Sequence, residues 1–359
     1  MKKVMVWFMG TFLVLMTMLC LCVPKQDISE SERRKLNQFP EFNFKTVTSG
    51  KFMSEFEEYA ADQFPFRELW RTLKARISFD VLKQSDNNEL YIEEGHVAKI
   101  EYPLHENSIS RAITIFQRIQ KEQLADKNCK VYYTLVPDKN YFFGEEHLQM
   151  DYKKLVSMMN DSLEDMTYID IMNLLSGDDY YKTDAHWKQE NLTEVAKVLG
   201  EKMGVDVATE YDKVKIETPF YGVYYGQIAL SLEPDELHYL TNETLEHCEV
   251  YDYQNQKKTS IYDREKVDGE DLYEMFLSGS ISLLEIKNPD ADTDKELVLF
   301  RDSFGSSIAP LLVEGYQKIT LVDIRYLPSS QIGKWVDFEN ADVLFLYSTS
   351  VLNHSETLK

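Results

Sequence analysis

The sequence predicts an α/β fold with a mostly parallel sheet, preceded by an apolar helix at the N-terminus. From about residue 108 onward, apolar β-branched runs alternate with helical patterns, the rhythm of parallel strands joined by crossover helices. Between residues 203 and 296 this rhythm is lost, and short aromatic-rich segments predict an irregular, β-rich insertion on the active face of the sheet. Residues 4–23 carry no charge, and such a run is long enough to span a bilayer as a helix.

The N-terminal run predicts where the protein is located. Lys2 and Lys3 precede the run and Pro24 ends it. Lysines on the short flank favour a cytoplasmic N-terminus, which places the rest of the chain outside the membrane. The run is longer than the apolar core of a usual signal peptide, and no A-x-A-like cleavage site follows it. We expect an uncleaved, single-pass signal anchor in the cell membrane, with a cleaved leader as the alternative.

Length and charge limit the organisation and the partners. The 359 residues suffice for one large domain or two small ones. We expect a signal anchor at 1–24, a tether at 25–47 and an extracytoplasmic domain at 48–359 that contains the insertion at 203–296. With 61 acidic and 39 basic residues, the net charge is −22. Such a surface repels phosphate backbones, so we expect no nucleic-acid partner.

The elements follow from the hydrophobic pattern. Residues 48–79 are predicted to form two helices separated at Pro65, and 91–100 a short strand. The alternating region predicts helices at 108–125, 151–163 and 187–203, and strands at 130–137, 167–175, 297–303, 318–325 and 342–348.

Metals and cofactors have no support in the sequence. Cys129 and Cys248 are the only cysteines outside the apolar run. They could form one disulfide or remain two thiols, and they show no metal-ligand spacing. The histidines other than His186 share no spacing typical of a metal site, and no Gly-rich phosphate loop is present. We therefore expect no metal and no cofactor.

Ser303 is the first candidate for chemistry. An apolar strand runs directly into Asp302-Ser303-Phe304-Gly305, and a helical pattern follows. Ser303 is thus predicted at the carboxyl end of a strand and the start of a helix, where ligands bind in open α/β sheets. Backbone N–H groups there can stabilise an oxyanion. The alternative is that Ser303 only caps the helix.

Asp184 and His186, in the stretch TDAHW, are the second candidates. Taken alone, such a pair is more typical of a structural ion pair than of a catalytic site. However, TDAHW also follows a predicted strand, so it could face the same crevice as Ser303. His186 could then act as the base for Ser303, and Asp184 could orient the imidazole.

These stretches resemble the DHHW family of Gram-positive bacteria, which is similar to the SGNH-hydrolase-like proteins of bacterial polysaccharide O-acetylation, including those that acetylate alginate. The motifs that carry the resemblance are ESERRKLNQFPEF, DQFPFRELW, LVPDKNYFF, YYKTDAHW, DSFGSSIAPLL and LVDIRYLP. The resemblance implies an SGNH-hydrolase-like (flavodoxin-like) three-layer sandwich. It also implies that Asp184, His186 and Ser303 are acid, base and nucleophile.

The chain departs from the family pattern at two positions. Ala185 stands where the family name has a second histidine, and Arg301 stands where SGNH esterases have a glycine. Arg301 could narrow the site or bind an acidic substrate. No secure equivalents of the family's oxyanion donors are found. The backbone N–H groups of Ser303 and Phe304, and the side chain of Asn140, are candidates.

Three further predictions concern neighbouring side chains. Lys139 could reach the crevice at the strand ends or simply be solvated. Trp187 could pack against the histidine loop or stack on a sugar ring. Asp323 and Arg325 are expected to form a structural pair.

The function implied by the resemblance is that of a membrane-anchored acyl-ester enzyme, an O-acetyltransferase or acetylesterase that acts on a cell-surface polysaccharide. A membrane-bound O-acyltransferase would be its partner and would deliver the acetyl donor. The alternative is a catalytically degenerate glycan-binding or assembly protein. The distance between His186 and Ser303 discriminates between these hypotheses, because a general base must come within hydrogen-bond reach of its nucleophile.

Overall fold

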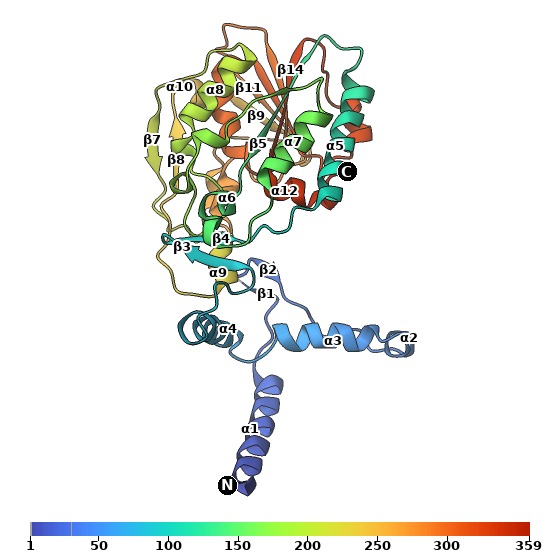
Figure 1. Ribbon diagram of the computed structural model, residues 1–359, viewed down its shortest axis with the longest axis vertical. Helices are drawn as coiled ribbons and strands as arrows, with labels where there is room; N and C mark the ends of the chain where they lie inside the picture. Colours follow the sequence, from blue (N-terminus) through green and yellow to red (C-terminus); the bar gives the residue numbers. More distant parts are fainter. Residues whose placement is uncertain (1, 30) are drawn as a thin grey trace. The chain divides into compact units, whose positions relative to one another are not determined.

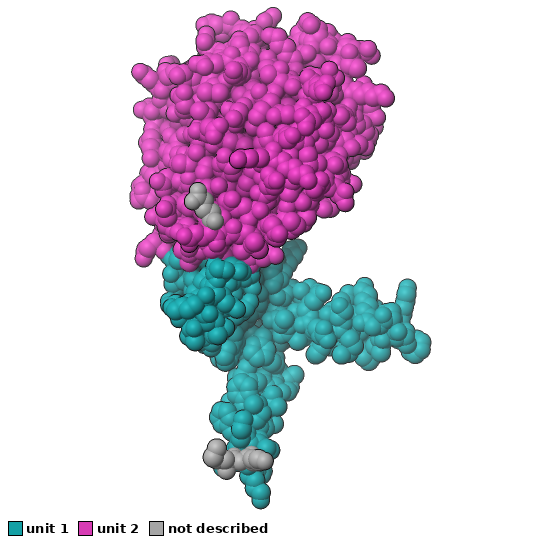
Figure 2. All heavy atoms as spheres, in the orientation of Figure 1, with its two compact units in different colours: residues 1–88, 225–232 teal, residues 89–224, 233–359 magenta. Residues whose placement is uncertain are grey.

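The computed structural model describes residues 2–29 and 31–359, and the chain forms two compact units. Unit 1 comprises residues 1–88 and 225–232, and unit 2 comprises residues 89–224 and 233–359 (Figure 2). The chain passes from unit 2 into unit 1 and back within and after α9 (Val223–Ile228).

Unit 1 is built mainly from helices. It begins with α1 (Lys2–Cys22), of which Lys3–Cys22 is long and apolar enough to cross a membrane. Two short strands then pair antiparallel, β1 (Ile28–Ser29) and β2 (Arg34–Lys35). The other helices are α2 (Phe44–Thr48), α3 (Lys51–Asp62) and α4 (Arg67–Arg76). The predicted break near Pro65 is confirmed, because α3 ends before it and α4 begins after it.

Unit 2 is built around an eight-stranded mixed sheet. Its strands are β5 (Lys130–Val136), β6 (Thr167–Tyr168), β9 (Glu249–Asp252), β10 (Lys257–Thr259), β11 (Leu283–Lys287), β12 (Glu296–Arg301), β13 (Lys318–Val322) and β14 (Ala341–Ser348). The order is β10-β9-β11-β13-β12-β14-β5-β6. Neighbours from β13 to β6 pair in parallel, whereas β11, β9 and β10 extend the β13 edge with antiparallel pairing. The predicted α/β fold with a mostly parallel sheet is confirmed.

Helices cover both faces of this sheet. Successive residues of a strand point to opposite faces, so Leu344 packs toward α8 (Thr193–Met203), while Phe345 packs toward α5 (Glu106–Ile119) and α7 (Tyr152–Ser162) (Figure 1). On the second face Phe345 stacks on Phe300 of the neighbouring strand, with ring centroids 4.5 Å apart. Unit 2 is therefore a three-layer α/β/α sandwich.

Several predicted elements differ in extent. The strand expected at 91–100 is a hairpin of β3 (Leu90–Glu93) and β4 (His96–Lys99). The strand expected at 167–175 stops after two residues, because the Asp170 carboxylate accepts a hydrogen bond from the Met172 N–H and turns the chain. The helix expected at 187–203 begins only at Thr193.

The segment 203–296 contributes to more than one layer of unit 2. In this segment β9, β10 and β11 join the main sheet with antiparallel pairing and extend its edge. Other parts of it, at Val223 and Asp235, contact the TDAHW loop as expected for an insertion on the active face. The remaining strands, β7 (Asp212–Lys215) and β8 (His238–Thr241), form a separate antiparallel pair.

Cys129 and Cys248 are free thiols, so the alternative of two thiols holds. Burial raises the pKa of both thiols, that of Cys248 to about 12. Neither side chain is therefore a reactive thiolate at neutral pH. Within residues 2–29 and 31–359, no group of three or more His, Cys, Asp or Glu side chains could hold a metal ion.

The layer assignment predicts the effect of truncating Leu344, which is fully buried in the sheet. Leu344→Ala should lower the free energy of unfolding by about 2–5 kcal/mol, because it removes buried methyl groups and leaves a cavity. Leu148→Ala is the control: this side chain is 57% exposed, and its loss should change stability by less than about 0.5 kcal/mol. Denaturant titrations followed by fluorescence measure both values. Equal effects of the two substitutions would contradict the assignment.

Candidate active site

The carboxyl ends of three parallel strands are fastened to one another. Asp302 follows β12, and its Oδ2 accepts a hydrogen bond from the Ser348 N–H at the end of β14, at 2.7 Å. Asp138 follows β5, and its Oδ2 accepts a hydrogen bond from the Thr349 hydroxyl at 2.7 Å. Because parallel strands end at one edge of the sheet, these contacts fix the loops that carry the candidate residues.

Ser303 lies in the turn between β12 and the short helix α11 (Gly305–Ile308). The turn is closed by Asp302, whose Oδ1 accepts a hydrogen bond from the Phe304 N–H at 3.0 Å. The Ser306 N–H donates to the Ser303 carbonyl at 3.1 Å. These two hydrogen bonds fix the backbone on both sides of the Ser303 side chain.

His186 lies between Ser303 and Asp184. Its Nε2 is 2.7 Å from Ser303 Oγ, and its Nδ1 is 2.6 Å from Asp184 Oδ1. Asp184 is 1% exposed and the His186 side chain 15%. Two stretches that are remote in the sequence thus meet in the order carboxylate, imidazole, hydroxyl, and the discriminating distance lies within hydrogen-bond range.

Asp184 is a buried carboxylate with several hydrogen-bond donors. Besides the imidazole, the His186 N–H donates to Oδ1 at 3.0 Å and the Val223 N–H donates to Oδ2 at 2.7 Å. Burial opposes ionisation, but the charge and hydrogen bond of His186, with these backbone donors, hold the pKa of Asp184 well below its usual value. An ionised Asp184 keeps the proton on Nδ1 of His186, which leaves Nε2 to accept one from Ser303.

The segment that supplies the Val223 N–H packs closely against the backbone of the TDAHW loop. The Gly222 N–H donates to Thr183 Oγ1 at 2.9 Å, and the Tyr224 N–H donates to the Thr183 carbonyl at 3.0 Å. A Cβ added at Gly222 would lie 2.3 Å from Asp184 Cβ and 2.4 Å from the Thr183 oxygen. Only glycine fits here without displacing the loop.

Asp235 holds the same loop from a second segment. Its carboxylate accepts hydrogen bonds from the Lys182 N–H at 2.7 Å, the Thr183 N–H at 2.8 Å and the Thr183 hydroxyl at 2.6 Å. Gly222, Val223 and Asp235 were not predicted as site residues. The only local signal was a glycine between aromatic residues in FYGVYYG.

Lys139 lies at the crevice and is buried rather than solvated. Its Nζ donates to the carbonyls of Tyr181, Lys182 and Asp184 at 2.8, 3.1 and 3.1 Å. Burial lowers the pKa of Lys139 to about 7, although the negative charges of Asp184 and Asp235 act in the opposite direction. Lys139 therefore positions the TDAHW backbone.

Aromatic rings enclose the imidazole. Tyr273, another residue that was not predicted, stacks on the His186 ring with centroids 3.9 Å apart and planes at 10°. Its hydroxyl and the Trp187 indole N–H both contact Ser307 Oγ at 2.8 Å. Trp187 is fully buried, which favours packing over stacking on a sugar. The Phe304 ring lies 5.0 Å from the His186 ring.

Arg301 points into the protein and does not reach the hydroxyl of Ser303. Its side chain is fully buried, and its guanidinium donates to the carbonyls of Gly279 at 3.2 Å and Ile281 at 3.4 Å. It also lies 4.0 Å from Asp323, which pairs with Arg325 at 2.7 Å as expected. Arg301 thus supports the backbone beneath the site.

Two of the three candidate oxyanion donors are already bonded. The Phe304 N–H donates to Asp302, and the Asn140 side chain donates to the Leu148 carbonyl at 3.0 Å while accepting from the Tyr91 hydroxyl at 2.8 Å. The Ser303 N–H has no acceptor among residues 2–29 and 31–359. Of the two backbone donors, it alone is free to bind a substrate oxygen, and the Asn140 amide keeps a second hydrogen.

The region that contains the three candidate residues matches a known protein family. Residues 149–322, which include Asp184, His186 and Ser303, match the family model described as DHHW protein. This match is to slightly less than half of the chain and makes this region similar to the DHHW family. The resemblance carried by the sequence motifs is thereby confirmed. No curated protein matches the sequence significantly.

Solved structures share the fold. A DHHW family protein from Eubacterium siraeum is 19% identical with a TM-score of 0.56, and the match covers 75% of this chain and 95% of that one. Bacillus cereus PatB1 is 17% identical with a TM-score of 0.57, over 74% and 97% of the two chains. PatB1 with a sulfonyl adduct matches at 17% identity and a TM-score of 0.56, over 73% and 97%. The SGNH-like fold predicted for the DHHW domain is confirmed.

The close approach at Gly222 predicts that Gly222→Ala disturbs the Asp184–His186 pair. The added methyl group should displace the TDAHW loop and lower the free energy of unfolding by about 1–3 kcal/mol. Proton NMR should show that the downfield signal of the His186 Nδ1 proton is lost or shifted. The control is Gly269→Ala, whose Cβ would approach only the Lys266 carbonyl, at 3.0 Å. An unchanged signal in Gly222→Ala would contradict the prediction.

The burial of Lys139 predicts a pH-dependent contribution to stability. The pKa of Lys139 is about 7 in the folded protein and near 10.4 when unfolded. Between these values the unfolded chain binds more protons, so this residue makes the free energy of unfolding rise with pH. Unfolding titrations at pH 6.5 and 9.5 should therefore show that wild type gains stability relative to Lys139→Met at the higher pH. The exposed Lys130 supplies the control, Lys130→Met, which should follow the wild-type profile. A pH-independent difference for Lys139→Met would refute the assignment.

Proposed function

We propose that this protein is a serine-dependent acyl-ester enzyme, an O-acetyltransferase or acetylesterase that acts on a cell-surface polysaccharide. The observation that carries the proposal is the 2.7 Å contact between His186 Nε2 and Ser303 Oγ, with Asp184 at 2.6 Å on the other ring nitrogen. A hydroxyl, an imidazole and an ionised carboxylate in this order are the parts of a nucleophilic acyl-transfer site.

Each side chain has a role in the proposed reaction. Ser303 Oγ attacks the ester carbonyl while His186 Nε2 takes its proton, and Asp184 stabilises the imidazolium that forms. The Ser303 N–H donates to the oxyanion of the tetrahedral intermediate. Collapse of this intermediate returns the proton from His186 to the leaving alcohol and leaves Ser303 acylated. A second hydroxyl, of a sugar or of water, then attacks the acyl-enzyme with His186 as base and releases Ser303.

Substrate, partner and location are proposed from the family resemblance and the N-terminal helix. Proteins of polysaccharide O-acetylation, which the motifs resemble, suggest a polysaccharide acceptor and a membrane-bound O-acyltransferase that supplies the acetyl group. The apolar span Lys3–Cys22 supports a single-pass anchor. Positive charge on its short flank favours an extracytoplasmic domain.

A degenerate, glycan-binding protein is the second candidate, and one observation favours it. Because Asp302 engages the Phe304 N–H, the Ser303 N–H is the one backbone donor of the candidates that is available to an oxyanion. An oxyanion hole with fewer donors stabilises the transition state less, by about 10²–10³ in rate for each missing donor.

Substitution of Ser303 distinguishes the two candidates. Ser303→Ala should lower turnover of a chromogenic acetyl ester at least about 10³-fold, because the nucleophile is lost. Ser306→Ala, which removes a nearby buried hydroxyl of α11, should keep activity. An aromatic sulfonyl fluoride should add one sulfonyl group, by mass spectrometry, to wild type and to Ser306→Ala but not to Ser303→Ala.

Two outcomes would count against the proposal. Activity that persists in Ser303→Ala, with circular dichroism like that of wild type, would remove Ser303 from the nucleophile role. A wild-type protein that neither turns over acyl esters nor reacts with the sulfonyl fluoride would favour the glycan-binding alternative.

A further inference from the structure

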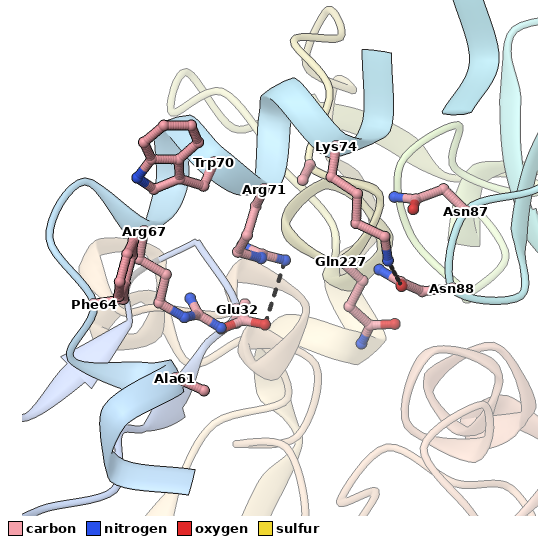
Figure 3. Close-up of a pocket in the computed structure, with 11 residues that line it drawn as sticks. Glu32, Ala61, Phe64, Arg67, Trp70, Arg71, Lys74, Asn87, Asn88 and Gln227 are labelled. Carbon is pink, nitrogen blue, oxygen red and sulfur yellow. Dashed lines mark hydrogen bonds and ion pairs between the residues drawn. The ribbon is translucent and has the colours of Figure 1, made fainter. Parts of the chain in front are cut away.

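Unit 1 contains a cavity of about 610 Å³ whose lining includes no residue of the candidate active site. Its walls come from α4, from the turn at Asn87 and Asn88, and from residues 227–229 (Figure 3). All of these segments belong to unit 1. The volume lies within the range of small-molecule sites and accommodates a sugar unit.

Three cationic side chains on one face of α4 line the cavity. Arg67, Arg71 and Lys74 line it at helical spacing and project to the same side (Figure 3). Glu32 is the one acidic side chain in the lining. It pairs with Arg67 at 2.5 Å and with Arg71 at 3.3 Å. The lining therefore carries three cations and one anion, in a chain whose net charge is −22.

Lys74 is the cation best placed to meet a ligand. Its Nζ donates to the neutral Asn88 Oδ1 at 2.6 Å, and no ion pair of Lys74 is found within residues 2–29 and 31–359. Arg67 and Arg71 are both engaged by Glu32 and also by Glu68, which lies outside the lining. An anion that enters the cavity would gain most from Lys74, because an ammonium without a carboxylate partner forms strong charge-assisted hydrogen bonds.

The cavity wall is held in place by buried polar contacts. Arg71 Nη2 donates to the Gly226 carbonyl at 2.6 Å, and Asn87 Nδ2 donates to the Ile228 carbonyl at 3.2 Å. These bonds fasten the segment around Gln227 to α4 and to the turn. A prearranged wall of this kind reduces the entropy lost when a ligand binds.

The remaining lining groups match a sugar rather than a simple anion. Trp70 is 40% exposed, and its indole N–H donates to the Pro65 carbonyl at 3.1 Å, so the ring is fixed while part of it stays accessible. An aromatic ring packs on the C–H face of a sugar. The amides of Asn88 and Gln227 can bind hydroxyl groups as donors or acceptors.

Asn87 supplies a reason to favour a saccharide over a lipid phosphate. Its Oδ1 is buried in the wall and accepts no hydrogen bond from the residues that the structure describes. A saccharide offers several hydroxyl donors around its ring to such an acceptor, whereas the phosphodiester group itself offers only acceptors and a lipid has donors only in its headgroup substituent.

We propose that this cavity binds a carboxylate-bearing sugar unit of a glycan. The carboxylate binds Lys74, the hydroxyl groups bind the amides of Asn88 and Gln227, and the sugar ring packs against Trp70. That this glycan is also the acetyl acceptor rests on the proposed function. The cavity then retains an acidic polysaccharide that the acidic surface elsewhere repels.

Binding to matched oligosaccharides tests the proposal. The full-length protein in detergent is titrated with oligosaccharides of galacturonate, glucuronate and mannuronate, and with their carboxyl-reduced, neutral counterparts. At least one acidic oligosaccharide should bind, and its reduced counterpart should not. Lys74→Gln should raise the Kd about tenfold, because one charged hydrogen bond is lost. Lys45→Gln, an exposed lysine of α2 outside the cavity, is the charge-matched control and should bind like wild type.

Three results would overturn the proposal. The first is a failure of all three acidic oligosaccharides to bind, and the second is equal affinity of wild type and Lys74→Gln for them. The third is a loss of binding to phosphatidylglycerol vesicles in Lys74→Gln alone, because that result would assign the cavity to a lipid headgroup. Ester turnover keeps this test separate from that of the proposed function, because Lys74→Gln should retain it. A wild-type protein that binds the uronate through Lys74 but turns over no acyl ester would refute the proposed function and leave the saccharide site standing.

Discussion

The candidate site depends on one buried, ionised carboxylate. A carboxylate removed from water is costly unless charge and hydrogen bonds compensate for the lost hydration. Asp184 receives this compensation from the imidazole and backbone of His186 and from the Val223 N–H. Its ionisation fixes the tautomer of His186, and the tautomer determines that Nε2 faces Ser303 as an acceptor. The roles of the three residues therefore follow from how the loop around Asp184 is held.

The chain holds this loop from three directions within unit 2. Lys139, from the end of β5, binds its carbonyls, Asp235 binds its N–H groups, and Gly222 lets the next segment approach without a side chain between them. Lys139 binds carbonyl groups of the loop and Asp235 binds its N–H groups, so few backbone groups of the loop stay unpaired. The sheet contributes the other half of the site, since the turn after β12 that carries Ser303 is fixed by Asp302.

The parts of the fold and site that could be predicted are those with a local signal. Apolar runs predicted β5, β12, β13 and β14, and the motifs predicted Asp184, His186 and Ser303. Tyr273, Val223 and Asp235 lie in the irregular segment 203–296, where no periodicity fixes which residue meets which loop. Their contacts arise from tertiary packing alone. A backbone N–H such as that of Val223 also has no sequence signature, because nearly every residue type supplies one.

The role expected for Arg301 from the sequence differs from the one that its packing indicates. In sequence it replaces a glycine next to the presumed nucleophile, which directs attention to substrate binding. In the structure its guanidinium lies beneath the turn, against the carbonyls of Gly279 and Ile281. A constraint on the proposed reaction lies instead in Asp302, because the bond that closes the turn also occupies the Phe304 N–H.

This constraint bears on the choice of acceptor in the proposed reaction. With few oxyanion donors, the tetrahedral intermediates of both proposed steps would be stabilised less. A sugar hydroxyl held near the acyl group gains an effective concentration that water in solution does not have. A site of this kind therefore discriminates in favour of a bound acceptor, and the proposed chemistry is better suited to acetyl transfer than to hydrolysis.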